Sequence, residues 1–369
     1  MNILRRLPLS RLLLLCGVVL AIGVSATALA SALGSGPTPP PKPLAQAIHD
    51  ALGGAGGEQI QGVSASVTLT DHLLEGASLA GGGQSGELTS NPLVTGASGR
   101  LWVAKDGHVR LELQSQQGDT QIVYDGHTIS MYDAATNTLY RYTPPAGEGG
   151  SSSSTPAGSQ HETPSVAKIE EAIAHLSKHA DVSGATPTDV AGQAAYTVRL
   201  SPKESGSLFG GVELSFDAVH GVPLRAAIYS SSSAAPVIEL AATEISYGPV
   251  ADSVFEVNPP ANAKIEEVSP PSSSGAHTEP KSGAADKPNV TTQGHGPSTI
   301  AVLESKTKAG AKSASEPLGG LPKVTINGIS ATELRTELGT LLTFERSGVR
   351  YLLAGSVTPA AIEAVARGL

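Results

Sequence analysis

Residues 101–142, LWVAKDGHVRLELQSQQGDTQIVYDGHTISMYDAATNTLYRY, are the stretch that decides the fold. Apolar and polar residues alternate within it, most clearly from Val109 to Gln114, and this period of two is typical of a strand with one buried face. The pairs Asp106-Gly107 and Asp125-Gly126 separate such runs, and glycine tolerates the positive φ that a tight reversal needs. The stretch therefore predicts an antiparallel meander with one apolar face and one polar face.

The flanking sequence extends this pattern on both sides. Further strands are expected at 63–70, 195–200, 212–216, 223–229 and 237–247. Apolar residues three or four apart predict one helix at 43–52 and a second at 163–179, with Thr163 as N-cap and Pro164 in its first turn. Between these elements, 79–99 is expected to be a Gly-rich loop and 144–160 a Ser/Gly/Pro-rich insertion. The chain is thus expected to be of the α+β class.

Residues 1–33 have the pattern of an export signal. Three arginines precede the apolar run 12–24, LLLLCGVVLAIGV, and small residues follow it. The segment is either a cleaved signal peptide or an uncleaved membrane anchor, because it is also long enough to span a bilayer. Both interpretations place the remaining chain outside the cytoplasm, in the cell envelope or secreted. The only cysteine, Cys16, lies inside this run, so no disulfide is expected in the exported part.

The composition and motifs exclude several classes of protein. The 369 residues include 24 Lys or Arg and 33 Asp or Glu, and a net charge of −9 argues against nucleic-acid binding, which needs clustered positive charge. No G-x-S-x-G elbow or P-loop occurs. His175 and His179 have a spacing found in zinc sites, but no third ligand is evident, so they are expected to face solvent. We therefore expect no enzyme, no cofactor and no metal site.

The chain beyond residue 268 predicts two further parts. Residues 269–318 are rich in Ser, Pro, Gly, Lys and Glu, and we expect them to form a disordered linker. Residues 319–369 are expected to form a small α/β module of helix, hairpin and helix. Its first helix would begin at a capping box of Ser330 and Glu333, its hairpin would turn at Ser347-Gly348, and its last helix would open at Thr358-Pro359.

Four segments of the expected main domain, 43–268, resemble the LolA-like family of bacterial lipoprotein carriers and the related RseB-like half-barrels, in a divergent exported form found in Gram-positive bacteria. The segments are GRLWVAKDGHVRL (99–111), VYDGHTISMYD (123–133), FDAVHGVPLR (216–225) and SVFEVNPPANAK (253–264). In this resemblance Arg110 stands at the position of the family's strand arginine, and the fourth segment at its closing strand. The insertion, the linker and the C-terminal module lie outside the family pattern.

The resemblance implies a curved antiparallel sheet, an incomplete barrel, covered by helices, with a hydrophobic cavity that receives acyl chains. Each CH₂ of such a chain gains about 0.8 kcal/mol on leaving water, so a carrier must offer an equivalent apolar surface. The cavity is expected to be lined by Val67, Leu69, Leu101, Val103, Leu111, Leu113, Ile169, Ile173, Leu214, Phe216, Leu224 and Ile228.

Three interpretations of this pattern stay open. The lead one is an exported carrier or sensor of a lipid or a lipoprotein acyl chain. The second is an RseB-like regulator that binds a membrane protein such as an anti-sigma factor. The third is an enzyme, although no catalytic set is evident in the sequence. For any single one of the apolar side chains, filling a core is an equally good interpretation, because apolar residues of period two are usually core residues.

Overall fold

The computed structural model describes residues 36–53, 60–74, 92–116, 118–144, 163–268, 289–306 and 321–369. The expected export signal at 1–33, with Cys16, lies outside the described residues. The same is true of nearly all of the expected insertion at 144–160 and of most of the expected loop at 79–99.

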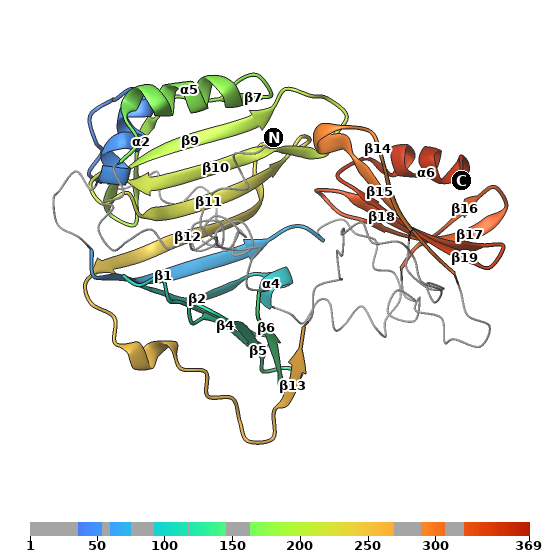
Figure 1. The fold of residues 1–369 in the computed structure, drawn as a ribbon, viewed down its shortest axis with the longest axis horizontal. Coiled ribbons are helices and arrows are strands. Elements are labelled where there is room, and N and C mark those ends of the chain that lie inside the picture. Colours follow the sequence, from blue (N-terminus) through green and yellow to red (C-terminus); the bar gives the residue numbers. More distant parts are fainter. Residues whose placement is uncertain are drawn as a thin grey trace, which may run out of the picture.

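Most of the chain up to residue 268 forms one curved, open sheet of 13 strands (Figure 1). In spatial order the strands are β13 (Lys264–Glu267), β6 (Thr138–Tyr142), β5 (Ile129–Asp133), β4 (Gly118–Tyr124), β3 (Val109–Ser115), β2 (Ala97–Ala104), β1 (Gly62–Asp71), β12 (Pro236–Tyr247), β11 (Pro223–Ser230), β10 (Phe209–Asp217), β9 (Gln193–Pro202) and β7 (Ala180–Val182), and β8 (Thr186–Val190) also pairs with β9. Every pair is antiparallel except β13 with β6. The sheet does not close into a barrel, because its two ends are separate edges.

Alternation of apolar and polar residues and the Asp-Gly turns predicted most of these strands. The meander of 101–142 is confirmed as β2 to β6, and the four strands expected between 195 and 247 are confirmed as β9 to β12. Gly107 and Gly126 have φ of 91° and 88°, as the Asp-Gly turns require. The short strands β7 and β8 were not predicted. They carry little apolar alternation of their own and depend on β9 for their hydrogen bonds.

Among the residues that the structure describes, three helices accompany the sheet, and they cover it only in part. Helix α2 (Leu44–Gly53) packs on β9 and β10 through Ala47. Helix α5 (Val166–Leu176) contacts mainly α2 and β7, so it lies beside the first helix instead of directly over the sheet. The short helix α4 (Pro92–Thr95) sits on β1, β3 and β4, inside the expected loop.

Two of the expected local features were wrong in detail. The N-cap of α5 is Ser165 and not Thr163, because the Ser165 hydroxyl accepts a hydrogen bond from the Lys168 N–H at 3.4 Å. The expected closing strand of 253–264 is instead a 3₁₀ turn, η3 (Asp252–Phe255), followed by extended chain. Two prolines in that segment remove the N–H donors that a strand would need. We call residues 251–268, which cross to β6 and end in β13, the strap.

The C-terminal part is a second antiparallel sheet with one helix. Its order is β14 (Asn289–Gln293), β15 (Ile300–Lys306), β19 (Val349–Gly355), β18 (Thr340–Arg346), β17 (Ile329–Arg335) and β16 (Lys323–Ile326), with η4 (Gly296–Ser298) after β14 and α6 (Pro359–Arg367) on one face. The hairpin at Ser347-Gly348 and the helix after Thr358 are confirmed. Its core joins strands β15 to β19 to α6.

Two expectations for this part were wrong. Residues 289–306, placed in a disordered linker, form β14, η4 and β15. The helix expected after Ser330 is the strand β17, and Glu333 is fully buried within it. The reversal before β17 is at Asn327-Gly328, with φ of 48° and 83°, which fits a two-residue hairpin turn. That Asn-Gly pair is a stronger signal for a hairpin than the capping box is for a helix.

The second sheet contacts the first at one end of β9 to β12 (Figure 1). The Leu208 N–H and the Ser207 hydroxyl both donate to the carbonyl of Ser356, at 2.8 and 2.9 Å. The Glu337 N–H donates to the carbonyl of Leu73 at 3.1 Å. These contacts place the C-terminal sheet beside the ends of β1, β10 and β11.

Candidate functional site

One side of the large sheet, which we call the apolar face, carries two separate hydrophobic clusters. The first lies on β1 to β4 beneath α4 and is built from Ala65, Val67, Leu69, Ala97, Leu111 and Leu113. The second lies on β8 to β10 beneath α2 and is built from Ala47, Ala185, Tyr196, Val198 and Phe216. The strand register places both clusters on the same side of the sheet, with β11 and β12 between them.

Burial on the apolar face decreases toward the C-terminal sheet. In the register row that contains Tyr196 and Phe216, both side chains are buried. The next row toward the C-terminal sheet runs Val198, Leu214, Ala226, Leu240 and Leu69, and it alternates buried with half-buried side chains. The last row runs Leu200, Val212, Ile228, Ile238 and Asp71, and every member is half-buried. We call this last row the mouth row.

The mouth row crosses five strands, from β9 to β1, at the sheet end next to the C-terminal domain. Four of its members are aliphatic and would gain from further burial, at about 25 cal/mol per Å² of apolar surface removed from water. This row of aliphatic side chains therefore stays partly accessible at the end of the sheet, whereas the two clusters are packed.

A carboxyl group ends the mouth row. Asp71 follows Leu69 by two residues on β1, so it lies on the same side, and its strand partner is Ile238. Burial raises the pKa of Asp71 to about 6, although the Leu73 N–H donates a hydrogen bond to Oδ1 at 2.5 Å and opposes that rise. This carboxyl group therefore changes charge near neutral pH, at the edge of an apolar surface.

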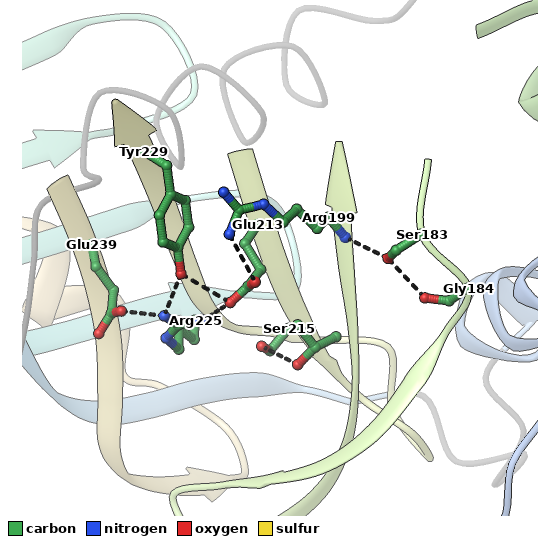
Figure 2. A network of polar contacts seen from close by, with 9 residues as sticks. Ser183, Gly184, Arg199, Glu213, Ser215, Arg225, Tyr229 and Glu239 are labelled. Carbon is green, nitrogen blue, oxygen red and sulfur yellow. Dashed lines mark hydrogen bonds and ion pairs between the residues drawn. The ribbon is translucent and has the colours of Figure 1, made fainter. Parts of the chain in front are cut away.

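The opposite side of β9 to β12 carries a polar network (Figure 2). The Arg225 guanidinium bridges Glu213 on β10 and Glu239 on β12. The Tyr229 hydroxyl donates to Glu213 and accepts from Arg225, both at 3.3 Å. The Arg199 guanidinium lies 3.9 Å from the centre of the Tyr229 ring. The network ties four strands, β9 to β12, together directly behind the mouth row.

Burial and partner charges set the protonation of this network. Burial alone would lower the pKa of Arg225, but the hydrogen bond and charge of Glu239 outweigh it, so the pKa is raised. Burial also raises the pKa of the Tyr229 hydroxyl. Two arginines and two glutamates balance in charge, so each charged group has a partner of opposite sign within the network. The network therefore acts as a rigid support for the strands.

Ten of the twelve residues of the expected cavity lie on the apolar face of the sheet, and the other two lie on α5. The buried members are Val67, Leu69, Leu111, Leu113, Ile169, Phe216 and Leu224, and the half-buried members are Leu101, Val103, Ile173, Leu214 and Ile228. Ile169 and Ile173 lie on α5, whose main contacts are α2 and β7, so they are not brought together with the sheet residues. Only Ile228 belongs to the mouth row.

Sequence reasoning missed the other four members of the mouth row. Leu200, Val212 and Ile238 lie inside strands that were predicted, but the alignment of one strand on another is not encoded in any single strand. Asp71 had a signal, because it continues the alternation of Val67 and Leu69 on β1. A carboxyl group at the end of an apolar series indicates the edge of a buried face.

Within the described ranges, no group of three or more His, Cys, Asp and Glu side chains is arranged to hold a metal ion. Over the same ranges, none of the helices has the length and hydrophobicity needed to cross a bilayer.

Comparisons with known proteins give one family match and several similar structures. Residues 85–148 match the family described as a predicted periplasmic protein, DUF2092. The search of curated proteins found no match.

Three similar structures illustrate the matches. The Pseudomonas aeruginosa MucA/MucB complex is 15% identical over 88% of this chain and 94% of that chain, with a TM-score of 0.40. An uncharacterized conserved protein from Thermus thermophilus is 12% identical over 61% of this chain and 99% of that chain, with a TM-score of 0.35. A putative outer membrane lipoprotein-sorting protein domain from Vibrio parahaemolyticus is 9% identical over 87% of this chain and 97% of that chain, with a TM-score of 0.20.

Of these three, one is described as a complex, one by lipoprotein sorting, and the third as uncharacterized. At TM-scores of 0.40 and below, what this protein binds has to be argued from its own residues. The similar structures include MucB and a putative lipoprotein-sorting domain, and residues 85–148 match a predicted periplasmic family.

Proposed function

We propose that the protein is an exported binding protein that takes an acyl chain of a lipid or lipoprotein onto the apolar face through the mouth row. The observation that supports this is the decrease of burial along the face. Side chains are packed under α2 and α4 and become half-buried toward the C-terminal sheet. A face that served only as core would be closed over at both ends.

An extended alkyl chain suits this geometry. The mouth row presents aliphatic side chains without an aromatic ring, and flexible chains pack well against such a surface. Each CH₂ that leaves water contributes about 0.8 kcal/mol, so eight carbons on the row contribute about 6 kcal/mol before the costs of binding are subtracted. We place the entry of the chain at Val212, Ile228 and Ile238, and its deeper seat at Leu214 and Leu224.

The proposal is tested with the purified exported chain. Lipid extraction followed by mass spectrometry should find bound lipid, and a fluorescent fatty-acid probe should bind and be displaced by palmitate. Ile228→Trp fills the mouth row and should weaken probe binding at least about tenfold, equal to about 1.4 kcal/mol. The matched control is Val290→Trp, on the exposed strand β14, which should bind the probe like wild type.

Two results would count against acyl binding. One is wild-type protein that carries no lipid and leaves the probe unbound. The other is equal loss of binding in both tryptophan variants, since that would mean the probe adheres to apolar surface in general. The wild-type measurements decide the question even if Ile228→Trp does not fold.

A second candidate function is regulation through a protein partner. The observation that favours it is the position of the C-terminal sheet, which is hydrogen-bonded through Glu337 to Leu73, two residues beyond Asp71. A partner held by the C-terminal sheet would lie next to the mouth row, so acyl binding and partner binding would influence each other. MucB is described in complex with MucA(peri), and a membrane partner of that kind is the proposal here. Co-purification of one membrane protein, reduced by added palmitate, would support this; recovery insensitive to palmitate would contradict it.

A further inference from the structure

The polar side of the sheet forms two adjoining pockets under the strap. The first, of about 420 Å³, lies over β2 to β4 and includes Trp102 and Gln121. The second, of about 610 Å³, lies over β5 and β6 and includes Ser130 and Arg141. Glu256 and Asn258 of the strap line both pockets, so the two are parts of one groove. Their volumes are within the range of about 300–1,000 Å³ typical of ligand sites.

Arg110 fixes the strap over this groove. Its Nη1 donates to the carbonyls of Val254 and Glu256 at 2.8 and 3.0 Å, and its Nη2 donates to the Gln121 side chain at 3.1 Å. Further along, the Asn137 side chain donates to the Asn262 carbonyl, and β13 pairs with β6. The groove is therefore a built feature, held at both ends by hydrogen bonds to the sheet.

The second pocket contains polar groups that are not engaged with one another. Ser130, Arg141 and Glu267 occupy one register row on β5, β6 and β13. Arg141 is half-buried, yet no ion pair or side-chain hydrogen bond joins it to Glu267 or to any other described residue. A half-buried Arg normally has a charged or carbonyl partner, and Arg141 has none among the described side chains, so within this part of the structure its donors face a ligand in the pocket.

We propose that this groove binds a short saccharide, neutral or amine-bearing. A sugar presents neighbouring hydroxyl groups that each need a donor or an acceptor, and the groove supplies donors from Arg141 and acceptors from Glu256 and Glu267. The indole of Trp102, at the other end, offers a flat apolar surface to the C–H face of a sugar ring.

The charge of the groove narrows the class of ligand. Arg110 and Arg141 contribute two positive charges against four carboxylates from Glu112, Asp125, Glu256 and Glu267. This excess of negative charge disfavours anionic sugars, phosphates and nucleotides, and it favours a protonated amine. The site is on the opposite side of the sheet from the mouth row, so it is independent of the acyl-chain proposal.

The sequence provides a direct reporter, because Trp102 is the only tryptophan of the chain. The full exported chain is titrated with glucosamine trimer, with cellotriose as the neutral sugar, with trigalacturonic acid as the anionic sugar, and with trilysine as a basic peptide. We expect the amine-bearing and neutral sugars to shift Trp102 emission at saturable concentrations, with the anionic sugar at least about tenfold weaker. Palmitate should leave Trp102 emission unchanged, which separates this site from the apolar face.

Variants test the assignment of residues. Glu267→Gln should remove the preference for the amine-bearing sugar over cellotriose, and Arg141→Gln should weaken both. Glu345→Gln, which changes a carboxylate on the C-terminal sheet, is the matched control and should behave like wild type. The proposal is overturned if no sugar shifts the emission of the wild-type chain, if the anionic sugar binds most tightly, or if trilysine binds more tightly than either sugar, which would make the groove a peptide site.

Discussion

Replacing Asp71 with Asn should stabilise the protein at neutral pH and leave it unchanged in acid. Burial raises the pKa of this carboxyl group from 3.8 to about 6, which means that the folded state holds the charged form at a cost. Asn keeps an oxygen that accepts the Leu73 N–H, and it carries no charge. The variant therefore isolates the effect of the charge at the end of the mouth row.

The magnitude follows from the shift. A raised folded-state pKa means that the stabilisation from protonation is fully present below about pH 4 and is lost as the pH rises through about 6. A difference of about two pKa units corresponds to about 3 kcal/mol at most, and partial exposure of the carboxyl group reduces this to about 1–2 kcal/mol. At pH 7 Asp71→Asn should gain that amount, or about 2–8 °C in Tm for a domain of this size.

The assay is urea unfolding of wild type and variant at pH 4, 5, 6 and 7. The difference in unfolding free energy should grow from near zero at pH 4 and level off above pH 6. Asp181→Asn, at a carboxyl group with 74% of its side chain exposed, is the control and should follow wild type at every pH. A constant difference across the pH range, or a variant less stable than wild type at pH 7, would refute the assigned burial of Asp71.

Three further predictions concern stability. Arg225→Met should cost about 3–5 kcal/mol, because it leaves Glu239 without its cation and leaves Glu213 with only Arg199, at 4.0 Å; denaturant unfolding would contradict this if the loss were below about 1 kcal/mol. Tyr247→Phe removes a 2.6 Å hydrogen bond to Asp217, whose pKa is lowered although burial opposes this, so the variant should lose about 1–3 kcal/mol at pH 7 and less near pH 2; an unchanged pH profile would count against it. Gly328→Ala should cost about 1 kcal/mol. The cost comes from backbone strain at a φ of 83° and not from a clash, because an added Cβ meets no atom within 4 Å; an unchanged Tm would contradict this.

The sequence predicted elements well where local chemistry controls them. Alternation and Asp-Gly turns gave β2 to β6, because side-chain period and the φ of a turn are properties of a few neighbouring residues. The helix predicted from the capping box at Ser330 was wrong, because that prediction also rested on local residues alone. Its residues are compatible with a helix in isolation, but Ala331 and Glu333 are buried in a sheet against α6. Tertiary burial outweighs a cap that contributes about 1 kcal/mol.

The apolar character of one face of the sheet can be obtained from the order of residues alone. The identity of the side chains in the mouth row cannot be obtained in this way. Asp71 pairs with Ile238, which lies 167 positions further along the chain (238 − 71). The same holds for the groove, where the strap returns to lie on Arg110. The sequence of one strand shows which of its two sides is apolar. Only the register between strands that are distant in the chain decides which of those apolar side chains remain accessible to another molecule.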